Sequence, residues 1–217
     1  MSEQSTDRLV AALAGQARPV EPLAPPLRRA ALTLAPVALT GAVLVLMFGD
    51  VRGMIARYSG REALMFVEMG AMLATALLAV TGAFILSVPG RSRLWLVAPL
   101  PTMLVWFTTS GVGCYRDLAH FGPDGWHLDG ADCLVFILAA GVPIGGLMLW
   151  RLSRARPIDP FPVALLGGLG AAALAAFLLQ FFHPFGLTVV DLGLHFAAVL
   201  IVVALAALSR RRTLTPA

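Results

Sequence analysis

The stretch that decides the fold lies at residues 162–182, which read PVALLGGLGAAALAAFLLQFF without a single charged side chain. An α-helix of about 20 apolar residues crosses the roughly 30 Å of hydrocarbon in a bilayer. Lipid offers no partner to an unpaired backbone N–H or C=O, so such a stretch must be helical. The sequence predicts an all-α integral membrane bundle of six helices, at residues 30–48, 65–87, 94–112, 133–150, 162–182 and 190–208.

The composition excludes a soluble protein. Apolar residues make up 59% of the 217 residues and charged residues 13%, against roughly 45–50% and about 25% in soluble domains. The segments outside the six stretches are shorter than the roughly 50 residues of a small domain, which excludes an appended catalytic domain. We therefore divide the chain into a tail at 1–29, a transmembrane domain at 30–208 and an arginine-rich C-terminus at 209–217.

The arginines predict the orientation in the membrane. All 16 basic residues are arginines, and 12 of them lie in the tail, the second and fourth connections and the C-terminus. The positive-inside rule places these segments, and both termini, in the cytoplasm. Residues 1–29 lack the short apolar core of a signal peptide, so we expect the first helix to be retained as an anchor. The pI near 10.0 then reflects topology and not nucleic-acid binding.

This orientation gathers the sulfur and imidazole side chains outside the membrane or at its outer boundary. Asp191 and His195 are four residues apart, which places them on one helical face. The candidate residues for a metal site on this side are His120, His127, His183, Asp191 and His195, on the same side of the membrane as Cys114 and Cys133. The spacing lacks the close C-x₂-C pairs of four-ligand sites, so for His183, Asp191 and His195 we favour a structural role in helix capping or in satisfying buried polar groups.

Cys114 and Cys133 have two interpretations. They enclose 18 residues on an oxidising side of the membrane, and a disulfide closing such a loop stabilises a protein by about 3 kcal/mol in chain-entropy models. The first interpretation is therefore a structural disulfide. The second is a redox- or metal-sensitive pair, since thiolates bind soft divalent metals.

Glu68 is an intramembrane acid in the outer part of the second predicted helix. An ionisable group there is costly and marks a candidate functional site. The structural alternatives are that it reaches water at the end of its helix or pairs with an outer arginine such as Arg61.

Small residues and prolines interrupt the apolar helices. Gly167, Gly168, Gly170 and the alanines at 171–173 form a smooth strip, which allows helices to approach closely in lipid. Pro36, Pro99, Pro101 and Pro143 each remove a helical hydrogen bond and are expected to kink their helices.

The tail contains a short helix and a proline-rich segment. Thr6 can cap a helix that runs to Ala14, with Gly15 ending it and Leu9, Val10 and Leu13 on one face. A helix of about nine residues is marginal alone, so it lies on the membrane surface or folds against a partner. Residues 19–29 are too rich in proline for a helix and are expected to be extended, as a spacer or as part of a docking site.

The chain resembles the NrsF-like family of bacterial membrane anti-sigma factors, which are six-span proteins that hold extracytoplasmic-function sigma factors inactive. The matching segments run nearly end to end, in the family's order and spacing. They are Pro19-Val20, Leu23 and Pro25 to Ala30; Leu86 to Arg93 with Trp95; Pro99-Leu100-Pro101; Gly111 to Cys114; Cys133 with Phe136; Pro143-Ile144-Gly145; Arg154 to Pro157; His183-Pro184-Phe185; and Asp191 with His195.

The resemblance implies that the tail restrains a sigma factor at the cytoplasmic face of the inner membrane, and that Cys114 and Cys133 help to sense metal or oxidative stress. The loops of Arg91/Arg93 and Arg154/Arg156 are expected to assist the tail. The residues expected to bind the sigma factor are Leu9, Val10, Leu13, Pro19, Val20, Leu23, Pro25, Pro26, Arg28 and Arg29.

The expected partners are this sigma factor and the lipid bilayer, without direct contact to nucleic acid; association between copies of the chain is left open. No enzymatic activity and no resident cofactor are expected, although a heavy or transition metal could bind transiently. The alternative function is a small solute or ion transporter using Glu68, Asp191 and His195. A membrane oxidoreductase using the cysteine pair is a weaker alternative, because the chain has no C-x-x-C motif.

Overall fold

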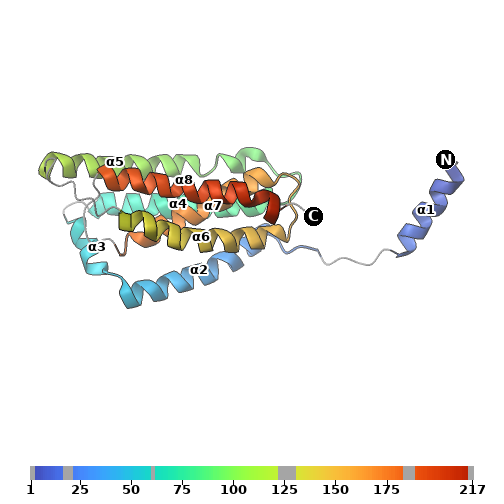
Figure 1. Cartoon of the computed structure of the whole chain (residues 1–217), viewed down its shortest axis with the longest axis horizontal. Coiled ribbons are helices and arrows are strands. Elements are labelled where there is room, and N and C mark those ends of the chain that lie inside the picture. Colours follow the sequence, from blue (N-terminus) through green and yellow to red (C-terminus); the bar gives the residue numbers. More distant parts are fainter. Residues whose placement is uncertain (1–2, 17–21, 60–61, 122–130, 183–188, 215–217) are drawn as a thin grey trace.

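The computed structural model describes residues 3–16, 22–59, 62–121, 131–182 and 189–214. Within these ranges the chain is all-helical, and its long helices run side by side in one elongated bundle (Figure 1). The elements are α1 Glu3–Gln16, α2 Pro26–Phe48, α3 Val51–Arg57, α4 Glu62–Leu86, the 3₁₀ helix η1 Arg93–Leu96, α5 Leu100–Phe121, α6 Ala131–Ser153, α7 Pro160–Leu179 and α8 Val189–Thr213.

Six of these helices, α2, α4, α5, α6, α7 and α8, are long and apolar enough to cross a membrane. The prediction of six transmembrane helices is therefore confirmed, with boundaries that shift by a few residues. The largest shift is in the third stretch, which was expected to be helical from residue 94. Here η1 is separated from α5 by residues 97–99, so Pro99 and Pro101 lie at the start of a helix and not inside one.

Helix α7 is the centre of the bundle and packs against α4, α6 and α8. Its small residues make this possible. A Cβ atom added at Gly168 would lie 3.0 Å from the Cα of Val203 on α8, and one added at Gly170 would lie 2.6 Å from Cγ2 of Val80 on α4. The predicted smooth strip thus packs within one chain, where close backbone approach replaces the hydrophobic effect that lipid cannot supply.

Helices α2 and α5 lie at the edges of the bundle. Helix α5 packs mainly on α4, and α2 makes its contacts with α4 and α6. Only Ala30 and Thr33 are buried along the whole of α2, and its apolar side chains face outward, as Leu46 does at 85% exposure. The helix that follows the tail is therefore the one that the bundle buries least.

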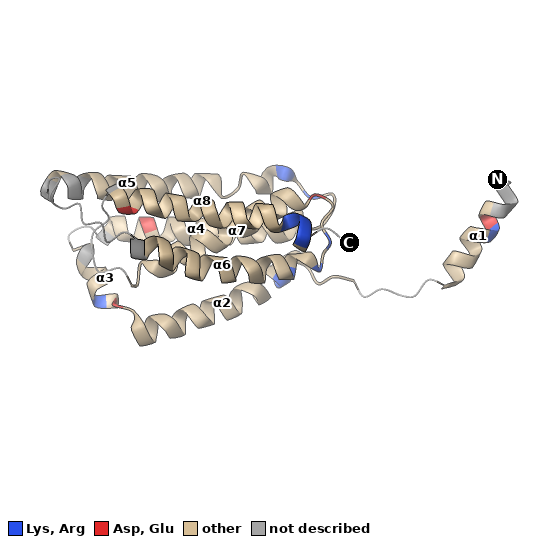
Figure 2. Ribbon diagram, viewed as in Figure 1, with Lys and Arg blue, Asp and Glu red and all other residues tan. Residues whose placement is uncertain are grey.

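More arginines are drawn at one end of the bundle than at the other (Figure 2). The arginines of the α2 start, the α4–η1 connection, the α6–α7 connection and the end of α8 lie at one end, where the tail leaves and the chain ends. We call this the arginine-rich end. Helix α3 with Arg52, the N-terminus of α4 and the C-terminus of α5 lie at the opposite end.

The tail differs from its prediction in two ways. Helix α1 runs from Glu3 to Gln16, so Thr6 lies inside the helix and is not its cap; Glu and Gln are good helix formers and extend the helix at both ends. The proline-rich segment was expected to be extended to Arg29, but α2 begins at Pro26. Proline is well suited to the first position of a helix, because its missing N–H has no intrahelical partner there.

Candidate functional site

A buried carboxylate joins three segments at the opposite end of the bundle. Glu68 on α4 is 2% exposed. Its Oε1 accepts a hydrogen bond of 2.6 Å from the hydroxyl of Ser110 on α5. Its Oε2 accepts a hydrogen bond of 3.1 Å from the hydroxyl of Tyr58, the residue that follows α3. The expectation that Glu68 reaches water at its helix end is therefore wrong. The expected pairing with Arg61 concerns a residue outside the described ranges and stays a prediction.

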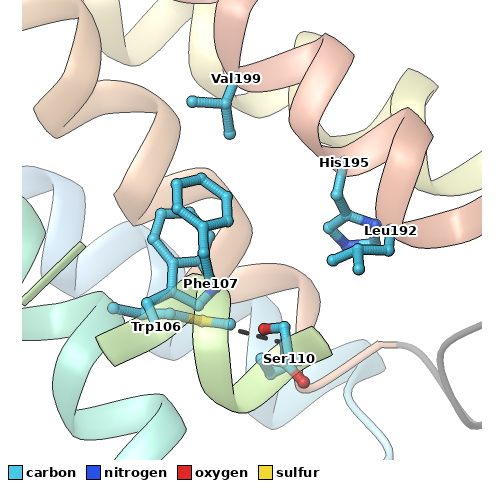
Figure 3. A pocket seen from close by; sticks show the side chains of 8 residues that line it. Trp106, Phe107, Ser110, Leu192, His195 and Val199 are labelled. Carbon is cyan, nitrogen blue, oxygen red and sulfur yellow. Dashed lines mark hydrogen bonds between the residues drawn. The ribbon is translucent and has the colours of Figure 1, made fainter. Parts of the chain in front are cut away.

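A small cavity adjoins this carboxylate network (Figure 3). The Ser110 side chain forms part of its wall, His195 and Leu192 line the side formed by α8, and the stacked rings of Trp106 and Phe107 line another. The volume is about 10 Å³, which is near the lower limit for one water molecule. This cavity is too small for a solute molecule.

His195 and Asp191 contact each other through the backbone of α8. Nδ1 of His195 lies 2.8 Å from the carbonyl oxygen of Asp191, and both residues are buried. The side chain of Gln180, at the end of α7, is buried nearby and donates a long hydrogen bond of 3.9 Å to the sulfur of Met72. These contacts support the structural role expected for Asp191 and His195.

The two cysteines are buried near the same end. Cys114 lies on α5 and is 4% exposed, and Cys133 lies in the first turn of α6 and is 2% exposed. Cys114 lies four residues after Ser110, so the two side chains occupy one face of α5.

The predicted metal site is only partly covered by the structure. Among the residues whose side chains are described, no three His, Cys, Asp or Glu residues lie close enough to hold a metal ion. His127 and His183 fall outside the described residues, and so does the side chain of His120. The involvement of these histidines, and the pairing of the cysteines, remain predictions.

The residues predicted to bind the sigma factor occupy two settings. Leu9, Val10 and Leu13 are exposed on α1, which stands apart from the bundle (Figure 1). Arg28, Leu23 and Pro25 are also exposed, whereas Pro26 is partly buried at the start of α2; Pro19 and Val20 lie outside the described residues.

Arg29 differs from its neighbour Arg28, because its guanidinium group faces the bundle. Its Nη1 donates a 3.3 Å hydrogen bond to the hydroxyl of Ser87, and its guanidinium carbon lies 5.2 Å from the centre of the Phe84 ring. Arg29 therefore fixes the start of α2 against the end of α4.

Sequence reasoning missed Tyr58, Ser110 and Gln180. Ser110 and Gln180 are polar residues in or next to apolar helices, and that alone could have marked them for buried polar contacts. Tyr58 carried no such signal, because it lies in a connection where an aromatic residue needs no special explanation.

Comparison with protein families gives the class of the chain. The family model NrsF, described as negative regulator of sigma F, matches residues 13–215. The chain therefore belongs to this family, and it is a multi-span membrane protein that negatively regulates a sigma factor, a regulatory and not a catalytic role. No curated protein and no solved structure matches it.

Proposed function

We propose that the chain is an inner-membrane anti-sigma factor that holds an extracytoplasmic-function sigma factor at its arginine-rich end and releases it when Cys114 and Cys133 react at the opposite end. Membership in a family of negative regulators favours this function over the transporter and the oxidoreductase. The orientation rests on the positive-inside rule, which assigns the arginine-rich end to the cytoplasm.

The observation that carries the proposal is the exposed apolar face of α1. Leu9, Val10 and Leu13 are each more than half exposed on a helix that stands apart from the bundle (Figure 1). A short amphipathic helix of this kind is a suitable docking element, because a partner can cover its apolar face in a groove. Loss of this face would release the partner.

The signal at the other end would act on α5 and α6, which carry one cysteine each. The reaction is either metal binding, in which thiols lose protons, or oxidation to a disulfide, in which the two thiols give two protons and two electrons to the oxidant. A disulfide is worth a few kcal/mol, and metal binding can be worth more. That is enough to shift the balance between two arrangements of a helix bundle.

The first experiment tests the tail. The host's extracytoplasmic-function sigma factors are each co-expressed with the chain, and a promoter that depends on each one drives a reporter. We expect the chain to repress one of them, and deletion of residues 1–18 to restore transcription while the protein remains in the membrane. If no sigma factor is repressed by the intact chain, the proposal fails.

The second experiment tests the cysteines. We expect C114S and C133S to abolish the response of this reporter to metals or oxidants while repression persists. The matched control is G113S, which also introduces a serine on α5 at a position where an added Cβ meets nothing within 4 Å. An unaltered response in both cysteine variants would leave the pair with a structural role only.

A further inference from the structure

A groove opens at the arginine-rich end between two connections of the bundle. Its walls come from the segment that joins α4 to η1 and from the segment that joins α6 to α7, and its volume is about 410 Å³. This is within the range of pockets that bind ligands or protein side chains. The sequence led us to expect that the Arg91/Arg93 loop assists the tail, but the groove itself has no part in the function argued so far.

The groove combines apolar walls with a basic rim. Ile158 is 82% exposed and Phe161 is about half exposed, although both are large apolar residues. Arg91 and Arg93 stand on the rim against a single acid, Asp159, which lies 3.6 Å from Arg93. The rim therefore keeps an excess of positive charge, and this favours an acidic partner.

The backbone of both walls is fixed by its sequence. Gly90 has a φ of 76°, which glycine adopts without strain. The Ser92 hydroxyl accepts a 3.3 Å hydrogen bond from the backbone N–H of Leu94 at the start of η1. Pro89 and Pro162, one in each wall, restrict the chain further. A groove that is formed in advance costs less ordering entropy when a partner binds.

The groove lies beside the point where the tail leaves the bundle. Arg29, in the first turn of α2, donates to Ser87, and the neighbours of Ser87 in the chain, Leu86 and Val88, line the groove. Nine residues separate the end of α1 from the start of α2, and they span at most about 30 Å. A single partner can therefore touch α1 and the groove together.

We propose that this groove is the second half of a two-part docking surface for the sigma factor, and that it binds an acidic segment of that protein which carries an apolar side chain. This docking role of the groove rests on the function proposed above, and it adds a second binding site for the same partner. Two linked contacts strengthen each other, because the second forms at the high effective concentration that the first provides. The tail would capture the sigma factor, and the groove would hold it at the membrane surface.

The test uses the full chain in nanodiscs of neutral phosphatidylcholine and, as probe, the sigma factor that the reporter screen identifies. The variants are R91E/R93E on the rim and I158S on the wall. The matched controls, R52E and I55S, change an exposed arginine and an exposed isoleucine on α3 at the opposite end. Because all five side chains are exposed, the variants should keep the thermal stability of the wild type.

We expect R91E/R93E to weaken binding about tenfold or more, mainly through a slower association rate that loses its dependence on salt. I158S should weaken binding through faster dissociation, and the controls should bind as the wild type does. Equal affinity in the groove variants and the controls would overturn the proposal and leave the tail as the docking site. The measurement is repeated in nanodiscs that contain anionic phosphatidylglycerol. If the groove variants lose binding only in these nanodiscs, the rim is a lipid headgroup site and the proposal is overturned too.

Discussion

Gly168 should not tolerate a side chain, although alanine is normally the better helix former. In G168A the new Cβ would lie 2.8 Å from the Cβ of Ala206 and 3.0 Å from the Cα of Val203. Carbon atoms in contact prefer about 3.5–4.0 Å, so α8 must move away from α7 by roughly 0.5–1 Å. The second atom belongs to the backbone, so no side-chain rotation can relieve the overlap.

When α8 moves away by this distance, the atom pairs between α7 and α8 lose about a quarter to a half of their van der Waals attraction. Overpacking of this kind costs about 1–3 kcal/mol. The matched control is G146A on α6, where an added Cβ meets nothing within 4 Å. It should show only the gain in helix propensity, which is at most about 1 kcal/mol.

The measurement is reversible unfolding of the purified protein in mixed micelles with increasing dodecyl sulfate. G168A should unfold with a free energy lower than that of G146A by about 1–3 kcal/mol. If the two variants unfold alike, the close packing of α7 against α8 is not what holds the bundle together.

Three further outcomes follow from contacts described above. S110A should lower the free energy of unfolding by about 1–3 kcal/mol, because it leaves a buried carboxylate with one donor fewer; the same titration of T108A, which removes an exposed hydroxyl from α5, should show little change. L13D should raise sigma-dependent transcription in the reporter strain without altering the amount of protein in the membrane, and unchanged transcription would contradict the docking role of α1. S87A should cost about 0.5–1.5 kcal/mol in the unfolding titration, since the Arg29 guanidinium group loses its acceptor; if the effects of R29A and S87A simply add in the R29A/S87A double variant, this contact contributes nothing.

The number and approximate positions of the six long helices could be predicted from the sequence, because a helix must be about 20 apolar residues long to cross the lipid. The ends could not be predicted as well. Pro26 begins a helix where prolines in the sequence suggested an extended segment. A proline at a first helical position and one in an extended segment have the same backbone φ, so composition alone cannot separate them.

The polar contacts were harder to predict than the helices. The sequence marked Glu68 as unusual because it is an acid in an apolar helix. Its partner Ser110 is 42 residues away, and nothing in the pattern of either segment fixes their relative rotation. The groove was hidden for the same reason: its two walls lie more than 60 residues apart in the chain, and only the packing of α4 against α7 brings them together.

The shallow burial of α2 has a consequence for how a signal could cross the membrane. The free energy needed to shift a helix rises with the contacts that must be broken, and α2 has few beyond Ala30, Thr33 and the Arg29 hydrogen bond. Lipid can replace the remaining apolar contacts at almost no cost, since its chains are as apolar as leucine. Because these contacts lie in the first two turns of α2, next to the tail, the far half of α2 can move against α4, α6, α7 and α8 more easily than the half that holds the tail.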